Sequence, residues 1–156
     1  MSAISIRRAR EADVAAIVAM LADDALGQAR EDASLPLAQA YLDAFAAIDS
    51  DPNQLLAVMA DGDEIIGTLQ ITFLAGLSLR GAWRGQIEAV RIASDRRSLG
   101  LGATMITWAV ERFRERGCFM AQLTSNNDRV AAHRFYERLG WKKSHSGFKL
   151  MLTKGD

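Results

Sequence analysis

The sequence has a single cysteine, Cys118, and only two prolines among its 156 residues. One cysteine permits no disulfide within the chain and no metal site built from several thiolates. The chain also lacks an N-terminal apolar stretch of signal-peptide length and any run long enough to cross a bilayer. We therefore expect a cytoplasmic protein in which Cys118 is a small buried apolar residue rather than a nucleophile.

The sequence also lacks a net charge, because 19 basic residues balance 19 acidic ones. Without an overall field of one sign, neither nucleic acid nor an anionic membrane is an expected partner. The two histidines, His133 and His145, lie apart and have no acidic cluster between them, so no metal site is predicted. The length and a hydrophobic content of 49% fit one globular domain over residues 1–156.

Hydrophobic spacing and turn residues predict a mixed α/β fold. Early strands follow one another as hairpins, and strands alternate with helices only in the second half of the chain. This order predicts a twisted, mostly antiparallel mixed sheet of about seven strands with helices on both faces. The expected strands cover 5–9, 54–60, 65–74, 83–92, 118–123 and a final hairpin within 141–153, and the expected helices begin near Asp13, Pro36, Gly102 and Val130, with 27–34 as a loop.

The strand expected over 83–92 does not alternate cleanly. Its apolar residues Ile87 and Val90 are three positions apart, so a regular strand would place them on opposite faces. A β-bulge near Glu88 or Ala89 would reconcile the two halves.

The segment that follows this strand has the features of a phosphate-binding loop. It contains two arginines, Arg96 and Arg97, and it passes into a helix at Gly100 and Gly102. A helix start leaves backbone N–H groups without partners, and glycine lets a phosphate approach them closely. No Gly-Lys-Ser/Thr follows, which excludes a Walker loop, and the third glycine of a dinucleotide fingerprint is missing.

Two segments together resemble the GNAT family of N-acetyltransferases. Arg97–Gly102 matches that family's Gln/Arg-x-x-Gly-x-Gly/Ala pattern, and Ala132–Trp141 is similar to its Ala-x-x-Phe-Tyr-Glu-x-x-Gly-Phe segment, with Trp141 in place of Phe. The resemblance covers essentially the whole chain and implies the GNAT fold, with acetyl-CoA as co-substrate and no metal. The residues that it implies for binding acetyl-CoA are Val90, Arg91, Ile92, Arg97, Ser98, Leu99, Gly100, Leu101, Gly102, Ala103 and Arg129, the last in place of the asparagine of many members.

The resemblance also implies direct transfer of the acetyl group to an amine, without an acylated enzyme. An alkylammonium must first lose a proton, and Glu88, just upstream of the loop, is the expected base, with apolar neighbours that predict partial desolvation. Tyr136 matches the family's tyrosine beside the thioester sulfur and is the expected acid. A backbone N–H near Val90 to Ile92 is expected to stabilise the carbonyl oxygen.

The acceptor is less well defined by the sequence. A small-molecule primary amine is the leading interpretation, and the alternatives are a protein N-terminus or lysine, and a CoA-binding module without catalysis. The acidic pairs Asp23-Asp24 and Glu31-Asp32 are expected either to face a cationic substrate or to lie in a polar surface loop. The assembly stays open, with a homodimer as one option.

Overall fold

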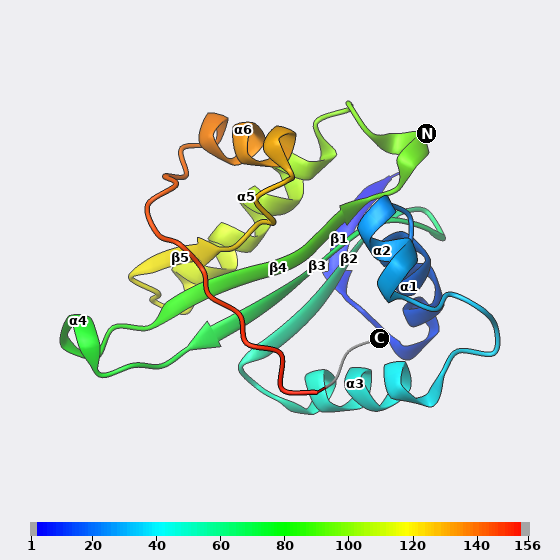
Figure 1. Cartoon of the computed structure of the whole chain (residues 1–156), viewed down its shortest axis with the longest axis horizontal. Helices are drawn as coiled ribbons and strands as arrows, with labels where there is room; N and C mark the ends of the chain where they lie inside the picture. The colour runs from blue at the N-terminus through cyan, green and yellow to red at the C-terminus, as the bar shows by residue number, and fades with distance from the viewer. Residues whose placement is uncertain (1–2, 154–156) are drawn as a thin grey trace. The chain divides into compact units, whose positions relative to one another are not determined.

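The structure, a computed structural model, describes residues 3–153, and its main feature is one five-stranded sheet (Figure 1). The sheet order follows the chain order, with antiparallel pairing from the first strand to the fourth and parallel pairing between the last two. The predicted mixed, mostly antiparallel sheet is therefore confirmed. Its strands are β1 (Ile4–Arg8), β2 (Gln54–Asp61), β3 (Glu64–Leu74), β4 (Arg84–Ile92) and β5 (Met120–Leu123).

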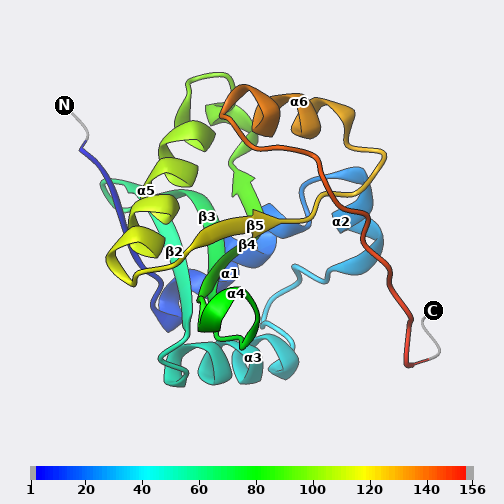
Figure 2. The ribbon, with the colours of Figure 1, turned by 90° about the vertical axis from the view of Figure 1, so that its left-hand side faces the viewer.

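Helices cover both faces of this sheet, as the sequence predicts (Figure 2). On one face, Phe113 meets the ring of Phe73 edge-on, and its ring lies so close to Gly85 that a Cβ there would be 2.2 Å away. On the other face, Ile17 packs on Val58, and Phe45 joins the same cluster. The helical segments up to Leu123 are η1 (Glu11–Asp13), α1 (Val14–Leu21), α2 (Ala25–Arg30), α3 (Gln39–Ser50), α4 (Ser78–Gly81), η2 (Ser94–Arg96) and α5 (Leu101–Glu115).

The described chain divides into two compact units that meet in sequence between Leu123 and Thr124. The first holds the sheet, and the second holds α6 (Val130–Arg138) and the segment after it. The single domain over residues 1–156 stays a prediction from the sequence.

Two predictions about the first half of the chain are wrong in detail. Helix α2 occupies part of the expected loop, because the Asp24 side chain accepts a hydrogen bond from the Gly27 N–H and caps the helix start. Helix α3 begins at Gln39 rather than near Pro36, since Ala38 still has extended backbone, with φ −57° and ψ 140°.

The expected final hairpin is also wrong, which leaves five strands among the described residues instead of about seven. Residues 142–153 pair with no described strand. The sequence offers a weak strand signal here, because the polar run 144–147 precedes three consecutive apolar residues, 150–152, that break the two-residue alternation. Phe148 and Leu152 are 96% and 90% exposed.

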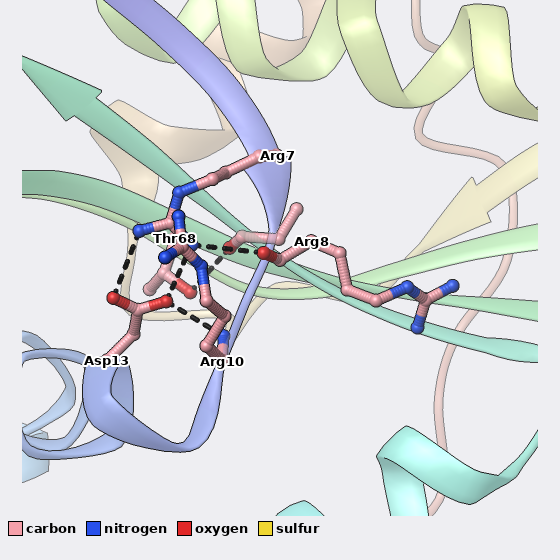
Figure 3. A network of polar contacts seen from close by, with 6 residues as sticks. Arg7, Arg8, Arg10, Asp13 and Thr68 are labelled. Carbon is pink, nitrogen blue, oxygen red and sulfur yellow. Dashed lines mark hydrogen bonds and ion pairs between the residues drawn. The ribbon is translucent and has the colours of Figure 1, made fainter.

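A polar network fixes the entry into α1 (Figure 3). Asp13 is buried, and its carboxylate accepts two hydrogen bonds from Arg7 of β1, Nη1 to Oδ2 at 2.7 Å and Nη2 to Oδ1 at 3.1 Å. The backbone N–H of Arg10 donates a further bond to Oδ2 at 2.8 Å. The Arg7 hydrogen bond is the main reason why the pKa of Asp13 lies below its usual value, with burial acting in the opposite direction.

We expect Asp13→Asn to lower the free energy of unfolding by about 1–3 kcal/mol, because the amide leaves Arg7 with a poorer partner. A lowered folded-state pKa stabilises the fold above the unfolded carboxyl pKa of about 3.9 and loses that effect as the pH falls through the folded value. Urea denaturation at neutral pH and at successively lower pH measures both effects. The exposed Asp23→Asn is the matched control. Equal acid sensitivity in wild type and Asp13→Asn would contradict this account.

Candidate active site

The predicted irregularity in β4 is a β-bulge. Pairing with β3 passes from Thr68–Arg91 to Gln70–Glu88, so two residues, Ala89 and Val90, lie opposite Leu69 alone. Ala89 has φ +55°, a left-handed value that is uncommon outside glycine. A bulge takes backbone groups out of the ladder and redirects the side chains around it.

The bulge coincides with the point where β4 loses its other neighbour. Strand β5 pairs with β4 from Arg84–Met120 only as far as Ile87–Leu123. Within residues 3–153, the half of β4 from Glu88 to Ile92 therefore has no strand on its β5 side. A strand half without a neighbouring strand can present backbone N–H groups to a ligand, which is the condition that the predicted oxyanion site requires.

The bulge also sets which side chains share a face. Glu88 lies opposite Gln70 and Arg91 opposite Thr68, so both belong to the face away from α5, although they are three positions apart. Ile92 points to the α5 side, where its Cδ1 lies near Gly67. Glu88 is exposed, so the predicted partial desolvation is wrong: its apolar neighbour Ile87 points to the opposite, buried face.

Arg91 is held by its surroundings. Its Nη1 donates to the Val90 carbonyl at 2.9 Å, and its Nε lies 3.7 Å from Oδ2 of Asp24. Asp24 also caps α2, so this carboxylate connects the start of α2 to β4. Of the four acidic residues considered for a cationic substrate, Asp24 is thus used within the protein. Glu31 and Asp32 also accept hydrogen bonds there, Glu31 from the Tyr41 hydroxyl at 2.9 Å and Asp32 from Ser34.

The loop between β4 and α5 has the backbone of an anion site. Gly100 immediately precedes α5 with φ +79°, and Ser98 has φ +67°, whereas Leu99 between them is not left-handed. Left-handed residues just before a helix can turn backbone N–H groups toward an anion. A Cβ placed on Gly100 would meet nothing within 4 Å, so open space lies in front of the helix start.

The two arginines of this loop have different roles. Arg96 is bound to carboxylates of the β2–β3 hairpin, with Nη1 at 2.7 Å from Asp61 and Nη2 at 2.8 Å from Glu64. It fixes the loop to the sheet and leaves little charge for a ligand, contrary to the sequence expectation. Arg97 is exposed, and its Nε donates to the Ile92 carbonyl at 3.3 Å, so its guanidinium faces solvent beside the loop.

The other predicted residues of the site lie in the second unit. Tyr136 is half-buried on α6, and its ring lies edge-on to Phe135 and Trp141, at 5.1 and 6.1 Å between centroids. Arg129 precedes α6 directly, and its backbone N–H donates to Asn126. His133 places Nε2 at 2.9 Å from the Asn126 carbonyl oxygen, a contact within the second unit.

Residues 18–141 match the model of the Acetyltransferase (GNAT) family. The chain belongs to this family. Its members are acetyltransferases that use acetyl-CoA, so the protein is an acyltransferase enzyme, and the fold that the sequence resemblance implies is confirmed.

Several known proteins are similar to this GNAT acetyltransferase. An aminoalkylphosphonate N-acetyltransferase of Salmonella typhimurium is 33% identical over 114 residues, which cover 73% of each chain. The crystal structure of a transcriptional regulator from Bacillus halodurans superimposes with a TM-score of 0.94 at 46% identity, covering 96% of this chain and all of that one. A predicted acetyltransferase from Clostridium acetobutylicum, solved with acetyl-CoA, gives a TM-score of 0.75 at 16% identity, covering 96% and 97%.

The β4–α5 loop fits the pyrophosphate of acetyl-CoA. Gly100 leaves open the space that a side chain would fill. This space lies at the N-terminus of the 15-residue helix α5, which is the positive end of its dipole, and Arg97 supplies an exposed cation. Cys118 is half-buried and precedes β5, which begins at Met120, so the expected buried residue at a strand start is wrong in detail. Burial raises the pKa of its thiol, which leaves less thiolate near neutral pH.

In the first unit, then, the structure brings together Glu88, the bulge, Arg91 and the loop.

None of the described helices is long and apolar enough to span a membrane. The left-handed backbone of Ser98, the Asp24–Arg91 pair and the glutamines that share the face of Glu88 (Gln54, Gln70, Gln86 and Gln122) were not predicted from the sequence. The glutamines carried a signal, since they interrupt otherwise apolar strands, but which of them are neighbours depends on strand register.

Proposed function

We propose that this GNAT protein transfers the acetyl group of acetyl-CoA directly to the primary amine of a small molecule. The observation that carries the proposal is the bulge at Ala89, which sets Glu88 beside a stretch of β4 backbone that no described strand covers on its β5 side. The relative from Salmonella, an aminoalkylphosphonate N-acetyltransferase, supports a small amine as acceptor.

Acetyl-CoA supplies the acetyl thioester, and the residues of the chain bind it and move protons. The loop Arg97–Ala103 holds the pyrophosphate through backbone N–H groups, and the backbone of Val90–Ile92 lies alongside the thioester arm and donates a hydrogen bond to its carbonyl oxygen. Glu88 takes a proton from the ammonium, directly or through water, so that the free amine can attack. Tyr136 donates a proton to the departing sulfur.

The test is a screen of amines with acetyl-CoA, in which released thiol is measured. We expect thiol release that depends on a small primary amine. Release with peptides alone would favour the acetylation of a protein N-terminus or lysine, and binding of acetyl-CoA without release would favour a CoA-binding module.

The role proposed for Tyr136 has its own expected result. Tyr136→Phe keeps the ring and its contacts with Phe135 and Trp141 but removes the hydroxyl. We expect kcat to fall about 10²-fold with little change in acetyl-CoA affinity, because the departing sulfur loses its proton donor. Steady-state kinetics and calorimetric titration of both proteins measure the two quantities. A variant with unchanged kcat would show that another group stabilises the sulfur.

A further inference from the structure

A row of polar side chains crosses four strands of the sheet beside Glu88. Gln54 of β2 pairs with Thr72 of β3, Thr72 with Gln86 of β4, and Gln86 with Gln122 of β5. The four residues therefore lie in register, one per strand, and we call them the polar row. Register places them on one face, and all four are half-buried.

This face is the one away from α5. The next residues along β3 and β4, Phe73 and Gly85, contact Phe113 on the α5 side. On the side of the polar row, the apolar cluster under α1 and α3 includes Leu56 of β2. Gln54, at the start of β2, is the next residue on that face and lies outside the cluster. A sheet that continued only as structural core would be expected to keep apolar residues here, because burying polar groups is costly unless they are hydrogen-bonded.

Hydrogen bonds fix the orientation of the amide groups at the β4–β5 end of the row. Arg84 lies on β4 two residues before Gln86, and its Nη1 donates to Oε1 of Gln122 at 3.1 Å. Nε2 of Gln122 in turn donates to Oε1 of Gln86 at 3.1 Å. A guanidinium can only donate, so it fixes the direction of both amides and leaves the NH2 group of Gln86 as a donor for a ligand.

Hydrogen bonds also orient the amide group of Gln54, at the β2 end of the row. Oε1 of Gln54 accepts two hydrogen bonds, from Oγ1 of Thr72 and from Nε2 of Gln70, each at 3.0 Å. Its NH2 group is therefore also left to donate. The row thus presents N–H donors at Gln54 and Gln86, and Gln86 lies on the same strand and face as the cation of Arg84. Glu88 contributes a carboxylate one step further along β4 on this face.

We propose that the polar row and Arg84 bind the anionic group of a dipolar acceptor, a small molecule with an oxyanion a short carbon chain away from its amine. Donors and a cation at Arg84 and Gln86 suit the oxyanion, and the carboxylate of Glu88 suits the ammonium. Residues two positions apart on a strand are separated by roughly 7 Å, which matches this kind of molecule. The inference rests on the proposed function, because it names the substrate class of the same site.

The experiment compares primary amines that differ in charge. The anionic acceptors are β-alanine, taurine and phosphoethanolamine, and the neutral one is propylamine. For the wild type we expect kcat/KM to be at least about 10-fold higher for one or more of the anionic amines, since hydrogen bonds to a charged group are the strong ones. Arg84→Met should move this ratio toward one, and Gln122→Leu should lower it while keeping the cation. Arg114→Met, on the exposed side of α5, should retain the wild-type ratio.

Equal rates with propylamine and the anionic amines in the wild type would overturn the inference, and so would the same ratio in Arg84→Met as in the wild type. A second measurement separates this failure from that of the proposed function. If no amine is acetylated, the proposed function fails, and the Arg84 Nε–H signal in a ¹⁵N spectrum then decides the inference. The signal should shift with an anionic amine but not with propylamine, and a signal unmoved by any of them would overturn the inference.

Discussion

Glu88→Gln is expected to lose most of the acetylation activity near neutral pH, by about 10²- to 10³-fold in kcat, while binding acetyl-CoA as the wild type does. Glutamine keeps the size and the hydrogen bonding of the side chain and removes only the basic site. The side chain is exposed at the edge of the bulge, so its replacement should leave the fold intact.

The pH dependence of this variant distinguishes a base from a simple charge. An alkylammonium has a pKa of about 10, so more of the acceptor is already deprotonated at higher pH. The variant should therefore recover part of its rate as the pH rises. If Glu88 only attracted the ammonium, its loss would raise KM and leave kcat unchanged. The measurement is the pH-rate profile of both proteins on one accepted amine.

The control is Glu111→Gln, which neutralises an exposed carboxylate on α5. It should follow the wild-type profile. Profiles of wild type and Glu88→Gln that rise in parallel at similar kcat would show that Glu88 is an ordinary solvated side chain.

Gly100→Val is expected to abolish acetyl-CoA binding, with at least about a 10²-fold loss of affinity. The backbone at Gly100 is left-handed, with φ +79°, which disfavours any residue with a Cβ by roughly 1–2 kcal/mol. The added side chain would project into the open space before α5, where the pyrophosphate is proposed to lie. The backbone strain and the added side chain therefore both act at the proposed pyrophosphate position.

Thermal unfolding with and without acetyl-CoA measures this effect, because a ligand that binds only the folded state raises Tm by mass action. Gly117→Val is the matched control: Gly117 lies just beyond the other end of α5, has φ +74° and has equally open surroundings. Wild type and Gly117→Val should show the shift, and Gly100→Val should not. A shift of equal size in Gly100→Val would contradict the proposed role of the loop.

Local patterns in the sequence predicted the features that local physics determines. The parity conflict between Ile87 and Val90 required a bulge, and the bulge is present at Ala89 and Val90. Gly100 and Gly102 indicated the start of a helix with an open approach, and α5 begins at Leu101. In each case the determining residues are neighbours along the chain.

Features that depend on tertiary structure were not predicted. The polar row exists only because residues from Gln54 to Gln122 come into register, which a single sequence does not specify. Arg96 was expected to add positive charge to the loop, but it binds Asp61 and Glu64, which come from a hairpin more than thirty residues earlier. The expected final hairpin failed for a related reason, because pairing of 142–153 needs a neighbouring strand as well as local propensity.

The central claim is direct transfer of an acetyl group to an amine, and its most direct test is the fate of a ¹³C-labelled acetyl carbonyl. The wild-type protein is incubated with labelled acetyl-CoA and an amine from the screen, and the products are followed by NMR and by intact-protein mass spectrometry. The account predicts that the label appears in an amide of that amine, at a rate that Glu88→Gln reduces, and that the protein itself gains no acetyl group. Label found only in acetate, or bound to the protein as an intermediate, would contradict it.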